Sequence, residues 1–446
     1  MVECYAKAKQ ERNLQMHKLT IMIGAAAVAA GVHAATVEID GVVWSYTDRD
    51  DTAKTVTLGL GGNGNTAMPT STAIDAASIP WVMTINSEQY AVTKVNSYAF
   101  YQCTSLTGTL AIPSFVTNIG ERAFASCTGL TGLASIGGVT SFGSYAFVDD
   151  KNMVGDISDL AQVVSFGNGV FQTCPKLTGE VRLNPALTTV SARLFNGAQI
   201  SRVTIPRSAT SIGDYTFCNT QLSALVVPGP KTVVSGTQTY MTVTDDNPFN
   251  GLDNLTSLFG WNTKVSKAAS GNMVRNASNC TLFMPANGYC DDFNLGGRSG
   301  NRVIYYGPTN GLDIAIDDFS KTITATPTTE AALTNMLNAA VAFKNGCGYD
   351  TRITVTNAIE LTAGAITAAN MQYATFNSLM FKVNTQAQLD SILAAVPASV
   401  PLSIDPSDSQ TELTVPQGRE VYVRLSGDGK QGRYVPKING LIISFH

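Results

Sequence analysis

A short phrase of apolar and polar positions recurs between residues 95 and 228. Each copy starts at an apolar residue and reaches a phenylalanine five positions later, as in Val95 to Phe100 and Ile119 to Phe124. The marker phenylalanines are Phe100, Phe124, Phe147, Phe171, Phe195 and Phe217, which lie 24, 23, 24, 24 and 22 residues apart. A unit of this size cannot bury its apolar face alone, so self-similarity at this period predicts a stacked solenoid.

The same pattern predicts two short extended pieces per copy. One follows the leucine that comes after the marker phenylalanine, and the predicted segments are 109–113, 180–183, 202–206 and 224–228. Several of them end in proline, which is tolerated at strand ends because pairing need not continue beyond it. A second piece, such as 116–119, precedes the next phenylalanine. The phenylalanines and leucines are therefore expected to form the inner rungs of the core.

The region before the repeats also predicts strands. The alternation of apolar and polar residues predicts one strand over 36–46 and another over 53–60, and the residues at 48–51 predict a turn between them. Residues 81–95 predict a hairpin around Asn86 and Ser87, and the Gly/Asn/Ser/Thr-rich segment 61–80 predicts a loop. Because terminal units of a solenoid must differ from inner ones to stay soluble, residues 35–94 are expected to cap the stack.

The pattern changes in the second half of the chain. It weakens after Pro230, and we interpret 231–308 as degenerate final repeats that end in a strand over 302–306. A second duplication follows, in which 322–337 parallels 379–393. Each copy predicts a strand and then an amphipathic helix capped by Thr328 or Thr385. Further strands are predicted at 352–356, 359–362, 401–405, 411–415, 420–425 and 439–445.

Three segments carry a family resemblance. Residues 119–130, 203–206 and 210–213 read I-G-E-R-A-F-A-S-C-T-G-L, V-T-I-P and T-S-I-G, and they closely resemble the BspA-type leucine-rich repeat of bacterial surface proteins. The resemblance covers six consecutive units, although the third lacks the cysteine and proline. It implies a curved solenoid on an exported protein, with adhesive or protein-binding roles and no catalytic residues to carry over.

These observations predict a mostly β fold: a BspA-type leucine-rich-repeat solenoid with an N-terminal β cap and a smaller α/β C-terminal region. The expected divisions are a signal peptide with an upstream extension (1–34), the capping strands and linker (35–94), the solenoid (95–308, degenerate after 230) and the C-terminal region with a probable internal duplication (309–446).

The N-terminal segment predicts export. Met16 to Lys18 and the apolar run 19–30 have the form of a signal peptide, with small residues near Ala34 suited to cleavage. Residues 1–15 read as an extension upstream of the true start at Met16, although Met1 remains open as the start. An uncleaved anchor or a buried helix is the alternative, but the run is short for a transmembrane helix. We expect a secreted or cell-surface protein whose mature chain does not span a membrane.

Composition narrows the choice of partner. Charged residues make up 14% of the chain and the formal net charge is −4, with no cluster of lysine and arginine. Nucleic acid and anionic membranes both require a basic patch and are therefore poor candidates. An extracellular protein or glycan is the expected partner, and the oligomeric state stays open.

Seven cysteines follow the leader, and none belongs to a C-x-x-C pair of the zinc-ribbon or thioredoxin kind. Three of them lie three positions after a marker phenylalanine: Cys103, Cys127 and Cys174. Other copies carry Asp150 or Ala198 there, so a column of buried thiols explains these positions better than disulfides do. Cys280 and Cys290, in a loop-rich stretch of an exported chain, are the predicted disulfide.

Candidate catalytic chemistry is sparse. Histidine occurs only at positions 17, 33 and 446, whereas a Ser/His/Asp relay or a histidine metal site needs a positioned imidazole. The G-x-G-x-x-G stretch at 59–64 is not followed by a helix pattern, so it predicts a linker and not a dinucleotide site. Carboxylate pairs lie in turn-like contexts, which favours solvated turns over a glycosidase pair and leaves open one loop-bound calcium ion. No enzyme activity, catalytic residue, cofactor or metal site is therefore expected.

The outward positions of the repeat strands are the most natural contact surface, because sheet residues alternate faces. The candidate binding residues are Thr109, Glu180, Arg182, Arg202 and Thr204, for which a plain solvated face is the alternative. We expect an exported protein that mediates protein or glycan binding and adhesion at the cell surface. The alternatives are repeats that target a C-terminal carbohydrate-binding or carbohydrate-active domain, and a structural component of an extracellular layer.

Overall fold

The computed structural model describes residues 34–227 continuously. Beyond them it describes residues 233–234, 237–238, 241–243, 257–260, 263–265, 278–285, 300, 302–307, 309–317, 320–405, 413–416, 419, 421–423 and 442–443. Of the predicted signal peptide, only Ala34 falls within these ranges. The chain divides into two compact units: unit 1 is Met1–Gly179, Val190–Ile200 and Tyr215–Thr220, and unit 2 is Glu180–Thr189, Ser201–Asp214 and Gln221–His446.

Unit 1 begins with two antiparallel hairpins. The first joins β1 (Ala35–Ile39) to β2 (Val42–Asp50), and the second joins β5 (Val82–Ile85) to β6 (Glu88–Val95). The second turns at Asn86 and Ser87, as predicted, and both residues have positive φ. The single strand predicted over 36–46 is wrong, because Asp40 (φ 50°) and Gly41 (φ 77°) form a two-residue turn of the kind that Asp-Gly favours.

These hairpins continue the sheet of the repeats. β3 (Thr55–Leu58) pairs antiparallel with β2 and parallel with β6, and β6 pairs parallel with β8 (Asn118–Ile119). The sheet order is β1-β2-β3-β6-β8-β10-β13, where β10 is Ser141–Phe142 and β13 is Ser165–Phe166. The N-terminal strands thus pair with the first repeat, and their role as a cap stays a prediction.

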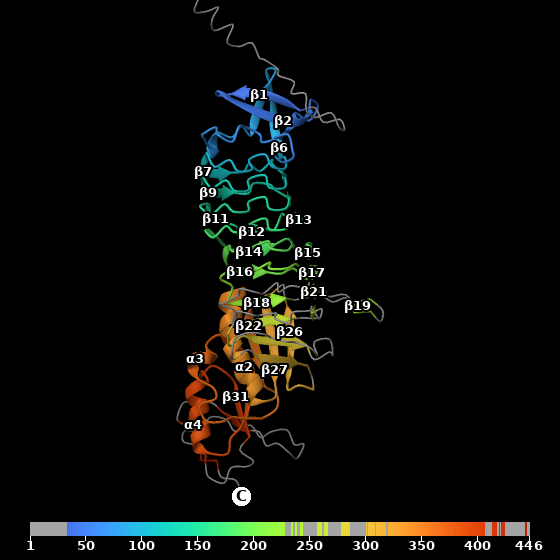
Figure 1. The fold of residues 1–446 in the computed structure, drawn as a ribbon. Helices are drawn as coiled ribbons and strands as arrows, with labels where there is room; N and C mark the ends of the chain where they lie inside the picture. The colour runs from blue at the N-terminus through green and yellow to red at the C-terminus, as the bar shows by residue number, and fades with distance from the viewer. Residues whose placement is uncertain are drawn as a thin grey trace, which may run out of the picture. The chain divides into compact units, whose positions relative to one another are not determined.

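A second parallel sheet is built from the strands at the leucine positions. They are β7 (Leu106–Ala111), β9 (Leu130–Ser135), β11 (Val154–Asp156), β14 (Leu177–Leu183) and β16 (Gln199–Thr204). Figure 1 shows β7, β9 and β11 one above another, and the register places Leu110 beside Leu133. Three strands begin three residues earlier than predicted, because ladder pairing continues through the residues before each predicted segment. The shorter elements are β4 (Ile74–Asp75), η1 (Ala76–Ser78), β12 (Asp159–Leu160), β15 (Thr189–Val190) and β17 (Ser211–Ile212).

The marker phenylalanines form one column in unit 1, as the period predicts. All six side chains are fully buried. Successive rings stack nearly parallel, with centroids 4.9 Å apart for Phe100 and Phe124 and 5.3 Å apart for Phe124 and Phe147. The later separations, through Phe171 and Phe195 to Phe217, are 5.8, 6.2 and 6.2 Å. Burial of each ring stabilises the stack by about 1.5–3 kcal/mol.

The backbone around each phenylalanine explains how one repeat joins the next. The residues two before and two after each marker have positive φ, for example Tyr98 (63°) and Gln102 (58°). Three N–H groups then donate to carbonyls of the following repeat: Tyr98 to Glu121, Phe100 to Ala123 and Gln102 to Ala125, at 2.8, 2.6 and 2.9 Å. Left-handed conformation costs about 1–2 kcal/mol per residue, whereas each hydrogen bond stabilises the fold by about 0.5–1.5 kcal/mol. Because these two contributions are similar in size, burial of the phenylalanine ring supplies the net stabilisation of each turn.

The cysteine column lies beside the phenylalanine column. Cys103, Cys127 and Cys174 are buried free thiols, as predicted, and the Sγ atoms of Cys127 and Cys174 each donate to a phenylalanine carbonyl at 2.9 Å. Asp150 and Ala198 occupy equivalent positions and are also fully buried. The third repeat therefore places a carboxyl group where its neighbours place a thiol.

Unit 2 continues parallel pairing in the segment predicted as degenerate repeats. Its four-stranded sheet has the order β18 (Ala224–Val227), β22 (Ser257–Gly260), β24 (Thr281–Pro285) and β25 (Arg302–Tyr306). Equivalent apolar residues align across it, with Leu225 beside Leu258 and Leu258 beside Leu282. The strand predicted at 302–306 is confirmed. Shorter strands are β19 (Val233–Val234), β20 (Thr237–Gln238), β21 (Met241–Val243) and β23 (Thr263–Val265).

The C-terminal part of unit 2 combines a mostly parallel sheet with helices. β26 (Leu312–Asp317) pairs antiparallel with β27 (Thr322–Pro327), and parallel pairing then runs through β28 (Asp350–Thr354), β30 (Ala374–Lys382), β31 (Leu402–Asp405) and β33 (Tyr422–Val423). The two predicted copies each contain a strand, a helix and a strand, β27-α2-β28 and β30-α4-β31, where α2 is Glu330–Ala342 and α4 is Gln386–Ala395. That they are a duplication stays a prediction. The remaining elements are η2 (Phe343–Cys347), β29 (Ile359–Glu360), α3 (Ala368–Met371), β32 (Leu413–Thr414) and β34 (Ile442–Ile443).

The helix caps were predicted correctly in one copy and one residue off in the other. The Thr385 hydroxyl caps α4 by accepting from the Gln388 N–H, as predicted. α2 is capped by Thr329, whose hydroxyl accepts from the Ala332 N–H, so the prediction of Thr328 is wrong. The Thr328 N–H instead donates to the Gly311 carbonyl, which holds that residue in the preceding turn.

One apolar core fills unit 2. Leu333, Met336 and Leu337 of α2 belong to the same buried cluster as Ala224 of β18 and Phe283 of β24. The α/β part and the sheet that contains β18 and β24 therefore share a core. In the described part of the chain no helix meets the length and apolarity needed to span a bilayer.

Candidate binding surface

The repeat strands present alternating side chains to solvent. Thr109 on β7 and Glu180 and Arg182 on β14 are exposed, and Arg182 lies between the buried Val181 and Leu183. Arg202 and Thr204 on β16 are half-buried. The five candidate residues therefore lie on strands as expected, three of them fully open to solvent. Their role in binding stays a prediction.

Arg202 makes contacts inside the chain that limit what it can offer a partner. Its Nη1 pairs with Glu180 Oε2 at 2.6 Å, and its Nη2 donates to the Asn345 carbonyl at 2.7 Å. Asn345 lies in η2, directly after α2. The guanidinium thus bridges the repeat strand β14 and the C-terminal part of unit 2. Of the two candidate arginines, Arg182 is therefore the exposed one.

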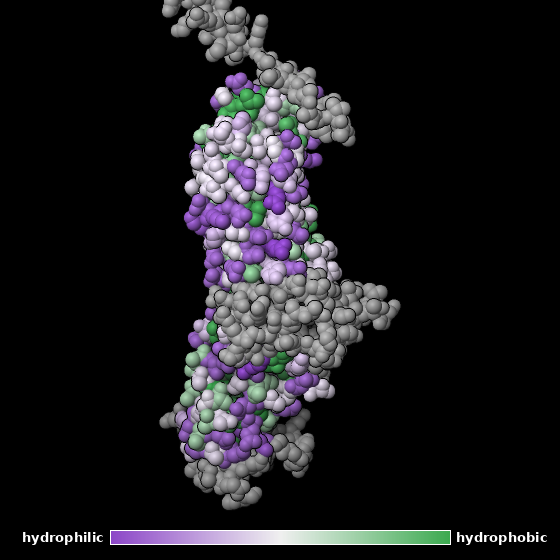
Figure 2. Space-filling view, in the orientation of Figure 1, coloured by the Kyte–Doolittle hydropathy of each residue, from purple (hydrophilic) through white to green (hydrophobic). Residues whose placement is uncertain are grey.

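The surface of unit 1 is polar and interrupted by few apolar side chains. In Figure 2 purple and near-white residues predominate over the repeats, and green ones are scattered. Large exposed apolar side chains in the described residues are Val43, Val82, Phe115, Val154 and Val164. This face therefore offers mainly hydrogen-bonding and charged groups, with few apolar side chains among them.

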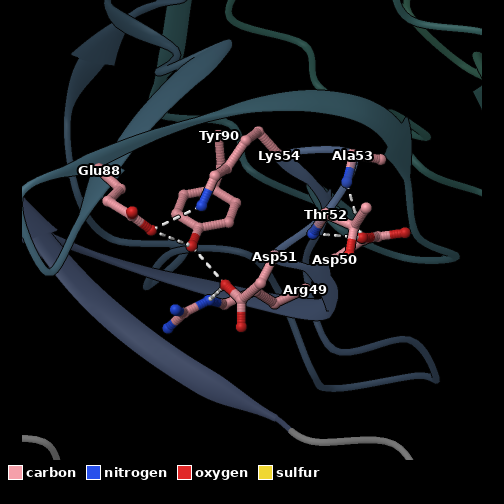
Figure 3. A network of polar contacts seen from close by, with 8 residues as sticks. All are labelled: Arg49, Asp50, Asp51, Thr52, Ala53, Lys54, Glu88 and Tyr90. Carbon is pink, nitrogen blue, oxygen red and sulfur yellow. Dashed lines mark hydrogen bonds and ion pairs between the residues drawn. The ribbon is translucent and has the colours of Figure 1, made fainter.

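A polar network joins the N-terminal hairpins (Figure 3). The Tyr90 ring is buried, and its hydroxyl donates to Asp51 and approaches Glu88 Oε2 at 2.9 Å. Arg49 pairs with Asp51 and Lys54 pairs with Glu88, each at 2.7 Å. Both cations also lie over the Tyr90 ring, at 4.9 and 5.2 Å from its centroid.

The electrostatics of this network favour a structural role. The hydrogen bond from Tyr90 and the ion pair with Arg49 lower the pKa of Asp51, and Lys54 and Tyr90 lower the pKa of Glu88. The hydrogen bond to Asp51 raises the pKa of Tyr90. A general acid or base works best with a pKa near the operating pH, and every one of these groups is shifted away from neutrality. The network therefore joins β2 and the turn after it to β6.

Burial also suppresses the reactivity of several described cysteines. Burial raises the pKa of Cys103 to about 11 and those of Cys280 and Cys347 to about 12, so the nucleophilic thiolate is suppressed. Cys280 is buried, but Cys290 lies outside the described residues, so the predicted disulfide stays a prediction. Among the described residues no three His, Cys, Asp or Glu side chains gather in a group that could hold a metal ion.

A shallow groove lies in the α/β part of unit 2. Its volume is about 580 Å³, and it is lined by one end of α2, by α3 and by Ser223. The lining side chains that can hydrogen-bond are neutral: Ser223, Asn338, Asn345, Thr367 and Asn370. Val341, Ala342 and Ala369 complete the lining. This groove can accept a neutral polar ligand.

Sequence reasoning missed a further column, at the residue two positions before each marker phenylalanine. It consists of Tyr98, Arg122, Tyr145, Gly169, Arg193 and Tyr215, all in unit 1. The signal was present in the repeated phrases S-Y-A-F, E-R-A-F and A-R-L-F, where this position varies between tyrosine and arginine. Strand alternation could not find it, because the column lies in the turns.

Comparison with known proteins identifies the repeats. The model of the BspA-type leucine-rich repeat region matches residues 93–223 and 151–257, with six copies. No curated protein matches the sequence. Among solved structures, a leucine-rich cell surface protein from Faecalibacterium prausnitzii is 14% identical, with a TM-score of 0.41 over 88% of this chain and 95% of its own. A leucine-rich repeat protein from Bacteroides ovatus is 16% identical (TM-score 0.24; 60% and 90% covered), and the pneumococcal vaccine antigen PcpA is 12% identical (TM-score 0.21; 61% and 98% covered).

Proposed function

We propose, from the premise that residues 93–257 form a BspA-type leucine-rich repeat region, that the protein is a secreted or cell-surface adhesin whose repeats bind another protein. Solenoids of stacked repeats offer extended surfaces on which equivalent residues recur at a fixed spacing. Binding would be non-covalent and would sum many weak contacts. The leader-like sequence before Ala34 supports export.

The observation that carries this proposal is the regular presentation of polar residues on a rigid stack. The core of each repeat is fixed by a fully buried phenylalanine and by hydrogen bonds to the next repeat. Exposed side chains such as Thr109, Glu180 and Arg182 are therefore held on ordered strands. Rigid presentation lowers the entropy lost on association, which favours affinity for a macromolecular partner.

A binding assay with a strand-face variant tests the proposal. The mature chain is immobilised and titrated with purified host matrix proteins. We expect saturable binding of at least one of them, weakened tenfold or more by Arg182→Glu. The matched control is Arg352→Glu, which alters an exposed strand arginine of β28 in the α/β part. Absence of binding by every protein offered would count against the proposal. Equal losses of affinity in Arg182→Glu and Arg352→Glu would show that the strand face is not the binding surface.

A second proposal concerns the groove in unit 2. Its asparagine, serine and threonine side chains offer neutral donors and acceptors that match the hydroxyl groups of a neutral glycan. Retention of the mature chain on insoluble neutral polysaccharides tests it. The double variant Asn338→Ala/Asn345→Ala should lose retention, whereas Asn357→Ala, at an exposed asparagine outside the groove, should keep it. Unchanged retention in the double variant would exclude the groove as a glycan site.

A further inference from the structure

The turns of unit 1 contain two columns with the same backbone conformation and different side chains. The column two residues before each marker has φ between 50° and 63° and carries Tyr98, Arg122, Tyr145, Gly169, Arg193 and Tyr215. The column two residues after has φ between 56° and 81° and carries Gln102, Ser126, Asp149, Thr173, Gly197 and Asn219. Because both columns have the same backbone conformation, the second shows which side chains that conformation alone favours.

The contrast between the columns requires an explanation. Left-handed conformation suits glycine, asparagine and aspartate and is an outlier for bulky residues, which pay about 1–2 kcal/mol in it. The second column mostly carries small polar residues, in keeping with this preference. The first column carries tyrosine or arginine in five of its six positions. Gly169 occupies this position in the fourth repeat, so the backbone turn forms there without a large side chain.

The large side chains of the first column are ordered against one another. The Arg122 guanidinium lies over the Tyr145 ring at 4.8 Å, and the Arg193 guanidinium lies over the Tyr215 ring at 5.6 Å. The Tyr145 ring lies so close to Gly169 that a Cβ there would be 2.7 Å from its Cδ1 and Cε1 atoms. The Tyr98 hydroxyl donates to Glu121 at 3.2 Å. These contacts reduce the freedom that each side chain would lose on binding.

We propose that the column of Tyr98, Arg122, Tyr145, Arg193 and Tyr215, here named the Tyr-Arg stripe, is the docking surface for an extended acidic segment of a partner protein. The inference rests on the proposed function, protein binding by the repeats, and specifies which surface binds and what kind of partner it binds. Tyrosine and arginine are the residue types enriched where binding energy concentrates in protein interfaces. Non-glycine residues in strained conformations also cluster at functional sites.

Charge decides the chemistry of the partner. Arg193 is exposed and has no ion pair within the described residues, and Arg122 has only Glu121, at 3.8 Å. A guanidinium stacked on a tyrosine is a preorganised donor for a carboxylate. The two arginines lie three repeats apart, which is about 14 Å at about 4.8 Å per strand spacing. An extended chain covers that distance in about four residues at about 3.3 Å each. The matching segment therefore carries acidic residues at positions i and i+4.

The ring contacts argue for a protein and against a sugar. Sugars commonly stack on the open faces of aromatic rings, whereas a guanidinium covers one face of both Tyr145 and Tyr215. Tyr98, Arg122, Tyr145 and Tyr215 are half-buried and Arg193 is exposed, so the stripe offers partly open tyrosine hydroxyls and guanidinium donors, which suit the carbonyl and carboxylate oxygens of a polypeptide.

The test selects binders from a phage-displayed library of random 12-residue linear peptides on the immobilised mature chain. We expect selected peptides to be enriched in Asp or Glu four residues apart, and their affinity to fall at least tenfold on Arg193→Gln. Gln102→Asn in the second column should change the affinity less than twofold. Circular dichroism and thermal unfolding of each variant show whether it is folded, and Arg193→Lys, which keeps the charge but loses the planar guanidinium, should give an intermediate loss.

Three results would overturn the inference. Peptides that bind equally to Arg193→Gln but lose binding to Arg182→Glu would support protein binding by the strand face and exclude the stripe. Selection of no peptides, together with no binding of matrix proteins, would exclude both the stripe and the proposed function. Retention on an array of acidic glycans that depends on Arg193, without any peptide binder, would assign the stripe to a glycan and contradict the protein partner.

Discussion

Asp150 Oδ1 accepts a hydrogen bond from the Cys127 N–H at 2.7 Å, while Asp150 Oδ2 is buried without a hydrogen-bond partner among the described residues. The residue is fully buried, and burial raises its pKa well above the ordinary value for aspartate. It stands in the column where neighbouring repeats place Cys127 and Cys174. The third repeat therefore contains a buried unsatisfied oxygen, and replacing this one side chain would remove it.

Asp150→Cys should stabilise the protein. In the column, the Cys127 and Cys174 thiols donate to the carbonyls of Phe100 and Phe147, so a cysteine at 150 is expected to use the carbonyl of Phe124 in the same way. Removing a buried unsatisfied polar atom is worth about 1–3 kcal/mol. Urea unfolding of the mature chain measures the gain. The half-buried neighbour Asp149, replaced by asparagine, should change stability little, and a loss of stability in Asp150→Cys would refute the explanation.

Titration of Asp150 should make the free energy of unfolding depend on pH. A carboxyl group whose pKa is raised on folding contributes stability that is present below its unfolded pKa of about 3.9 and is lost as pH rises through the folded pKa. Wild type should therefore lose stability relative to Asp150→Asn as pH rises from about 4, by about 1.4 kcal/mol per pH unit until the folded pKa is reached. Parallel unfolding curves of the two proteins at pH 4 to 8 measure it, and a pH-independent difference would show that Asp150 does not titrate as inferred.

The network around Tyr90 should respond in the opposite direction. The pKa values of Asp51 and Glu88 are lowered on folding, so their contribution is present above the unfolded values and is lost as pH falls through the folded ones. The pKa of Tyr90 is raised, so its contribution is lost only as pH rises through a value above 10. Tyr90→Phe keeps the ring and removes the hydroxyl, and it should lower the melting temperature modestly at neutral pH and weaken the acid dependence. Tyr101→Phe, at a half-buried tyrosine outside the network, is the control, and equal effects of both changes would exclude the network.

Gly346 should tolerate no side chain. A Cβ at this position would lie 2.8 Å from the Cβ and backbone N of Ala224, so η2 and β18 would have to separate. Overpacking of this kind typically costs about 1–3 kcal/mol. Thermal unfolding of Gly346→Ala measures the loss, with Asn345→Ala at the exposed neighbouring position as control. If Gly346→Ala were as stable as wild type, the close approach of η2 to β18 would be contradicted.

The sequence predicts the interior of the stack well because the same positions of each repeat are buried against the next repeat. The period alone placed Phe100 and its counterparts in one column and Cys103, Cys127 and Cys174 beside them. It did not predict the hairpin at Asp40 and Gly41, since the flanking apolar residues also fit one continuous strand. Three strands begin before their predicted starts because pairing between neighbouring repeats extends each ladder.

The candidate surface was harder to predict than the core. Strand alternation identified exposed positions such as Arg182, but it could not reveal that Arg202 bonds to Asn345, which lies 143 residues away in the sequence. The Tyr-Arg stripe escaped prediction because tyrosine and arginine do not signal left-handed conformation. Hydrogen bonds to the next repeat impose that conformation, and the conformational preferences of the individual residues do not predict such bonds.

Hydrogen–deuterium exchange on the mature chain tests most directly whether the repeats are the recognition module. The chain is measured alone and with a saturating amount of the tightest matrix protein or selected peptide. Added protection over the turns and strands of residues 95–227, with 320–405 unchanged, is the predicted result. Added protection confined to 320–405 would contradict the account and would assign binding to the α/β part.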